Sequence, residues 1–84
     1  DNGMTVLLVS DVHATKSLAA LALQVGSLEN PTDQPGLAHY LEHMVLMGSK
    51  RYPKPDNLAE FLKKSGGSHN ASTASYRTAY YLEV

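Results

Sequence analysis

The stretch GLAHYLEHMVLMG, residues 36–48, is the most informative part of this sequence. Its apolar residues recur at helical spacing and a glycine stands at each end, so it predicts a helix that starts near Gly36 and ends at Gly48. A helix of this kind buries its apolar side chains against the rest of the domain. The side chains expected in the core are Leu37, Leu41, Met44 and Val45.

Two histidines and a glutamate interrupt the apolar pattern in the segment HYLEH, residues 39–43. Positions four apart lie about one turn and about 40° from each other on a helix, so His39 and His43 can converge on one metal ion. Glu42 flanks the same face, where a carboxylate can act as general base toward a metal-activated water. Such a histidine pair also occurs on ordinary helices. The apolar surroundings, in which an unpaired charge is costly, strengthen the case for a metal site, but by themselves they leave an ordinary surface or core role open.

Outward from this helix, other segments predict strands and a second helix. The β-branched stretch Thr5–Ser10 predicts a strand. Residues Ser17–Val25 favour a strand, although their alanines also allow a helix. Asn57–Ser65 predicts a second helix, which Gly66-Gly67 ends. The apolar stripe expected on that helix consists of Leu58, Phe61 and Leu62.

The carboxyl-terminal stretch Tyr76–Val84 again predicts a strand, with tyrosines that pack across a sheet. The stretch before it, Ser68–Ser75, is small and polar. The order of elements along the chain is interpreted as β-β-α-α-β-β. This order indicates the α+β class.

Composition sets limits on size and partners. The chain has 84 residues and no cysteine, so it forms at most a small core without disulfides. Its formal net charge is −1 and it has no large basic cluster, so nucleic acid is not an expected partner. No apolar run approaches the ~20 residues of a membrane span, and no leader is visible. The chain stops inside the apolar run Tyr80–Val84, and we interpret it as a fragment of a longer protein.

The match to a known family is carried by HxxEH, the inverted zinc-protease motif. The longer stretch GLAHYLEHMVLMGSKRYP resembles the zinc-site helix and following loop of the pitrilysin/insulysin family of metallopeptidases. DNGMTVLLVSD is similar to that family's amino-terminal hairpin, VGSLENP to its approach to the helix, and GGSHNASTASYRTAYYLEV to its later strand pair. The resemblance covers essentially the whole chain. It implies that residues 1–84 are the N-terminal part of the first, catalytic domain. The fold it implies is a mixed α/β roll with helices on one face of a mostly antiparallel sheet.

The resemblance also implies roles for individual residues. His39 and His43 match the family's ligands of a single Zn²⁺ ion, and Glu42 matches the general base. Asn70 and Ala71 match the edge strand that holds a peptide substrate as an added strand. The implied substrates are peptides and small unfolded polypeptides, and the implied location is the bacterial periplasm.

One departure from the family pattern concerns the third zinc ligand. In the family this ligand is a glutamate on a later helix, and neither Glu60 nor Glu83 stands in that context. We therefore expect the chain by itself to be inactive and to depend on the rest of the parent chain. His69 is expected to be solvent-exposed or hydrogen-bonded rather than a ligand.

Two other interpretations remain. Non-catalytic members of the same fold scaffold or present peptides, but they typically lose part of the motif, which is intact here. A cut fragment can also self-associate through its strand edges.

Overall fold

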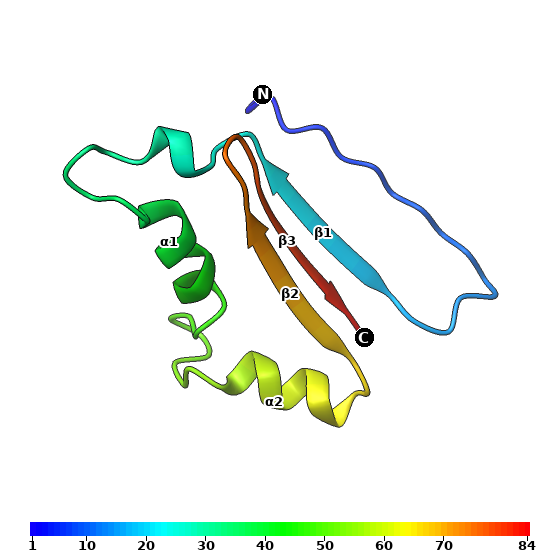
Figure 1. Cartoon of the computed structure of the whole chain (residues 1–84). Coiled ribbons are helices and arrows are strands. Elements are labelled where there is room, and N and C mark those ends of the chain that lie inside the picture. Colours follow the sequence, from blue (N-terminus) through cyan, green and yellow to red (C-terminus); the bar gives the residue numbers. More distant parts are fainter.

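The computed structural model describes all 84 residues and confirms the α+β class. Three antiparallel strands form a sheet in the order β1-β3-β2, and two α-helices lie beside the β2 edge (Figure 1). The elements are β1 (Leu18–Leu23), the 3-10 turn η1 (Ser27–Glu29), α1 (Leu37–Val45), α2 (Asn57–Lys64), β2 (Ser68–Thr73) and β3 (Thr78–Glu83). Neither helix has the length and apolar character that a bilayer span requires.

The register of the sheet decides which side chains face the helices. Tyr80 in β3 lies between Leu21 of β1 and Ala71 of β2. Residues 69, 71 and 73 of β2 are half-buried, whereas the residues between them are exposed, so this set faces the helices. The stretch that allowed either a strand or a helix, Ser17–Val25, therefore contains a strand, because β3 provides the hydrogen-bonding partner.

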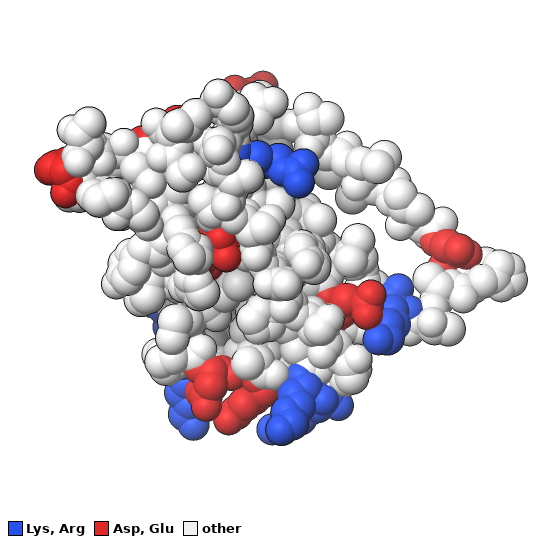
Figure 2. Space-filling view, in the orientation of Figure 1, with Lys and Arg blue, Asp and Glu red and all other residues white.

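The predicted strand at Thr5–Ser10 does not form. This part of the chain is an extended arm beside β1, projecting from the body of the molecule (Figures 1 and 2). Its middle residues, Leu7, Leu8 and Val9, are 83% exposed or more. The hydrogen bonds of the arm are local, such as that from Met4 N to Asn2 Oδ1 (3.0 Å). A β-prone sequence without a paired neighbour gives only extended chain, because a strand is defined by its ladder.

The predicted core face of α1 is also wrong. Glu42 is the buried residue of this helix, with 7% of its surface exposed. Ala38 and Leu46, one turn to either side, are half-buried, so the line through these three residues faces β2. The neighbours of α1 in this chain are β2, β3 and η1, and they cover only one face of the helix. The apolar side chains left exposed are Leu37, Leu41, Met44 and Val45.

The second helix follows its predicted pattern more closely. Leu62 is the one fully buried apolar side chain, and Leu58 is half-buried, but Phe61 remains 59% exposed. Gly66, at φ +70°, ends the helix, and the next residue's N–H donates to the carbonyl of Leu62 (2.7 Å). This is the Schellman arrangement, in which a glycine accepts the left-handed conformation. The predicted helix end is confirmed.

A short segment between β1 and α1, residues 25–30, holds the helix and the sheet together. We call it the bracket segment. At one end the side chain of Asn30 accepts a hydrogen bond from the N–H of Ala38, in the first turn of α1 (2.9 Å). At the other end the N–H of Ser27 donates to the carbonyl of Ala74, just after β2 (2.9 Å). The position of α1 relative to the end of β2 is therefore fixed by one short piece of chain.

Candidate metal centre

The two histidines of α1 point toward a common position. The Nε2 atoms of His39 and His43 are 3.1 Å apart, and the ring centroids are 4.8 Å apart. Both side chains are exposed, so a ligand can reach them from solvent. The convergence predicted from the four-residue spacing is confirmed by this geometry.

The donor set fits a zinc ion. Two nitrogens bound at ~2.0–2.1 Å to one tetrahedral zinc lie about 3.3 Å apart, close to the observed separation. Binding requires an unprotonated Nε2 on both rings, whereas a direct hydrogen bond between His39 and His43 requires a proton on one of them. The two arrangements therefore exclude each other, so a bound metal ion would replace the direct contact between the rings.

Glu42 completes the cluster from a different environment. The ligand atoms of His39, Glu42 and His43 all lie within 4.8 Å of one another. Unlike the histidines, the Glu42 side chain is buried, and its Oε2 atom accepts a hydrogen bond from the hydroxyl of Thr73 in β2. The sequence pattern placed this carboxylate on the correct side of the helix but gave no sign of its burial or of the threonine.

No further metal-ligating side chain of the chain joins this cluster. Glu83 instead forms an ion pair with Lys16, at 3.0 Å between Nζ and Oε1. Glu60 is an exposed residue of α2. The 84 residues thus provide two imidazoles and one carboxylate to this cluster.

A cavity of about 460 Å³ opens next to the cluster, between α1, the start of α2 and β2. Glu42 and His43 line it from the helix side, and His69, Asn70 and Ala71 line it from the strand. The residues predicted as substrate-binding are therefore brought to the same cavity as the predicted base. His69 is half-buried in this wall rather than free in solvent, but it is not a member of the metal cluster.

The strand wall of this cavity is an unpaired edge. Strand β2 pairs with β3 on one side only, because it is the last strand in the sheet order. The N–H of Ala71 donates to the side-chain oxygen of the preceding residue, Asn70 (2.9 Å), and so points away from β3. An edge N–H of this kind can pair with a peptide carbonyl in an added strand.

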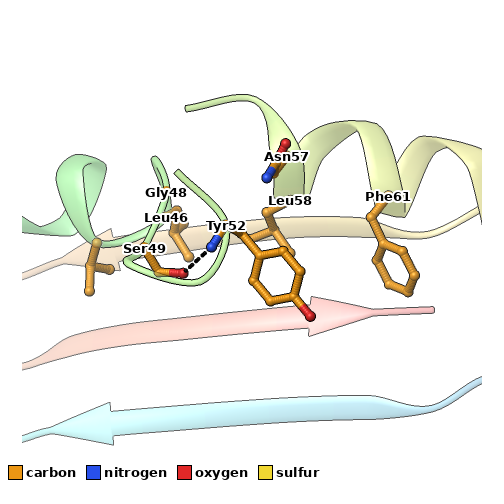
Figure 3. A pocket seen from close by; sticks show the side chains of 8 residues that line it. Leu46, Gly48, Ser49, Tyr52, Asn57, Leu58 and Phe61 are labelled. Carbon is orange, nitrogen blue, oxygen red and sulfur yellow. Dashed lines mark hydrogen bonds between the residues drawn. The ribbon is translucent and has the colours of Figure 1, made fainter. Parts of the chain in front are cut away.

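A second cavity, of about 420 Å³, lies on the other side of Leu46 and has a different character (Figure 3). The rings of Tyr52, from the segment between α1 and α2, and Phe61, from α2, point to the same side of it, and Leu58 also lines it (Figure 3). No histidine, aspartate or glutamate lines this cavity. Carboxylate and imidazole side chains therefore line the first cavity and not the second.

Charge is distributed without a dominant sign. Acidic and basic side chains occur together along the lower edge of the molecule, over α2 (Figure 2). The formal net charge is −1. Long-range electrostatics thus gives the chain no strong preference for either sign of partner.

Comparison with known proteins gives the family to which this fold and this cluster belong. The profile of the family described as Insulinase (Peptidase family M16) matches residues 5–84. The chain belongs to this family, which confirms the resemblance drawn from the HYLEH helix and its surroundings.

Relatives within the family include bacterial and animal proteins. The chain is 73% identical over 84 residues to Protease 3 of Escherichia coli (strain K12), covering 100% of the chain and 9% of that protein. It is 47% identical over 83 residues to insulin-degrading enzyme of Mus musculus, covering 99% of the chain and 8% of that protein. The crystal structure of pitrilysin superimposes with a TM-score of 0.91 at 73% identity, covering 100% of this chain and 9% of that one. The chain thus spans less than a tenth of the length of these relatives.

Proposed function

We propose that residues 1–84 are the N-terminal part of the first, catalytic domain of a zinc metalloendopeptidase. The observation that carries this proposal is the pair of convergent Nε2 atoms, 3.1 Å apart, beside a buried and hydrogen-bonded carboxylate. Membership of a peptidase family supports the same conclusion. The proposed substrates are peptides and small unfolded polypeptides.

Each residue of the cluster has a distinct role in this proposal. His39 and His43 hold one zinc ion through Nε2, and a glutamate beyond residue 84 of the parent chain completes the ligand set. The bound ion supplies Lewis-acid activation of water and of the scissile carbonyl. The carboxylate of Glu42 accepts the proton of the attacking water and delivers it to the leaving amine nitrogen.

The substrate is proposed to bind as an added strand on the β2 edge at Asn70 and Ala71. A carbonyl of the peptide replaces the Asn70 side chain as acceptor of the Ala71 N–H, which frees the asparagine amide to contact the peptide. Recognition through backbone groups depends more on an extended conformation of the substrate than on its side chains. This mode suits a peptidase that prefers unfolded segments.

Two consequences concern the chain by itself and its location. Two imidazoles without a third protein ligand bind zinc weakly, so we propose that residues 1–84 alone are inactive. We place the parent protein in the bacterial periplasm, on the basis of the resemblance of its sequence to bacterial members of the family such as Protease 3.

The decisive experiment compares the full-length parent protein with its Glu42→Gln variant. Zinc per chain and cleavage of an unstructured peptide are measured on the same samples. The variant is expected to keep its zinc and to lose cleavage by about 10²–10⁴-fold, the contribution of a general base. Loss of zinc from the variant would contradict the assignment of Glu42 as a base that does not bind the metal.

The same samples test the non-catalytic alternative. If both forms hold zinc and neither cleaves the peptide, the parent is a scaffold or peptide-presenting member of the family. Cleavage by the wild-type protein removes that alternative.

A further inference from the structure

The hydroxyl of Thr73 in β2 contacts the carboxylate of Glu42 in α1, although the two residues are 31 positions apart in sequence. The hydroxyl donates to Oε2, and it is the one hydrogen bond that the chain makes to this carboxylate. We infer that Thr73 is a positioning residue, which holds Glu42 in the orientation needed for proton transfer. This inference rests on the proposed function, in which Glu42 is the general base.

The threonine is itself rigidly held. It stands opposite Thr78 in the β2–β3 ladder, and Thr78 is 4% exposed. The hydroxyl of Thr78 donates to the carbonyl of Val25, in the bracket segment (2.7 Å). Directly after Thr73 the hairpin is closed by a hydrogen bond from Ala74 N to the carbonyl of Arg77 (2.8 Å). A β-branched side chain on such a backbone has few available rotamers, so its hydroxyl points in a defined direction.

Glu42, by contrast, has several rotatable bonds and no other side-chain partner. A glutamate on a helix that is fixed only at its backbone samples several orientations, and proton transfer requires one of them. The contact with Thr73 engages Oε2 and leaves Oε1 without a hydrogen bond from the chain. Oε1 is thus the oxygen available to accept the proton of the attacking water.

The bracket segment fixes the relative position of the two elements that make this contact. The segment binds the first turn of α1 through Asn30 and the end of the β2–β3 hairpin through Ser27. Glu42 lies one helical turn after Ala38, and Thr73 lies directly before Ala74, so both residues are close to these two attachment points. The distance between carboxylate and hydroxyl is therefore set by local hydrogen bonds on both sides of the site.

The test uses the full-length, zinc-loaded parent protein and two variants of one residue. Thr73→Val keeps the shape of the side chain and removes the hydroxyl, whereas Thr73→Ser keeps the hydroxyl and is the matched control. Zinc per chain, the melting temperature, kcat and KM are measured separately. For Thr73→Val we expect unchanged zinc and KM within about 2-fold, with kcat lower by about 10–100-fold, the effect of a misplaced catalytic group. Thr73→Ser is expected to restore kcat to within a few-fold of wild type.

A double variant and a structure separate positioning from packing. When Glu42 is already glutamine, Thr73→Val is expected to cause no further loss of kcat, because the two residues act as one unit. In crystal structures of the metal-free variants, the Glu42 carboxylate is expected to lose its single orientation with valine and to keep it with serine.

Three results would overturn the inference. One is an undiminished kcat in Thr73→Val, another is a fall in kcat that matches a loss of zinc, and the third is a failure of serine to restore activity. A wild-type parent that does not cleave peptide would instead remove the proposed function. An active wild type with a fully active Thr73→Val variant would remove this inference alone.

Discussion

At the scale of single residues, the site combines two exposed imidazoles with one buried carboxylate. His39 and His43 converge because helical geometry brings residues four apart to the same side. That relation follows from the sequence once the helix is recognised. The burial of Glu42 and its contact with Thr73 do not, because they depend on how α1 is turned against β2.

The ligand assignment predicts the effect of removing one imidazole. In the full-length parent, His43→Ala is expected to lower zinc from about one ion per chain to a small fraction and to abolish cleavage, because a single histidine of this chain remains. Zinc is measured by elemental analysis after gel filtration. His69→Ala is the matched control, since His69 lines the cavity without belonging to the cluster and its loss leaves the zinc content unchanged. A fully zinc-loaded His43→Ala protein would contradict the assignment.

At the scale of elements, position and partner matter more than composition. Helix α1 forms where its periodicity predicts, yet the apolar side chains expected in the core remain exposed, and the face that packs on β2 carries Glu42. The arm at Thr5–Ser10 has strong β propensity but no ladder. In both cases the local pattern predicts a helical or an extended backbone, which the structure has. It does not predict which part of the chain packs or pairs against that backbone.

The unpaired edge of β2 predicts a selective effect of proline. Ala71→Pro removes an N–H that points away from β3, and proline is tolerated at such edge positions. The loss of one backbone contact to the peptide is expected to raise KM by about 3–10-fold, the equivalent of one net hydrogen bond. Ala71→Ser, which keeps the N–H, is the matched control and retains the wild-type KM. Equal KM values for proline and wild type would argue against strand addition at this edge.

At the scale of the whole molecule, the 84 residues form a thin assembly of one sheet and one partial helical layer. The radius of gyration is 15.0 Å, compared with about 12 Å for a compact domain of this length. Leu62 is the one buried hydrophobic residue, and many large apolar side chains are exposed. In the relatives, which are more than ten times longer, further chain is available to cover such surfaces.

This exposure predicts the behaviour of the isolated chain. The 84-residue polypeptide, with a monomer mass of 9.1 kDa, is expected to self-associate through the β2 edge and its apolar faces. Sedimentation equilibrium across a concentration series is expected to give an average mass that rises above the monomer value. A strictly monomeric result over the whole range would remove this prediction.

The sequence by itself determined the α+β class, the positions of both helices, the end of α2 at Gly66 and the convergence of His39 with His43. These features depend on contacts within a few residues, which helix and turn geometry fix directly. Only the tertiary structure decided that Glu42 is buried, that Thr73 is its partner and that the stretch Thr5–Ser10 stays unpaired. Each of these depends on contacts, or on the lack of contacts, with distant parts of the chain. A local sequence pattern does not specify such long-range contacts.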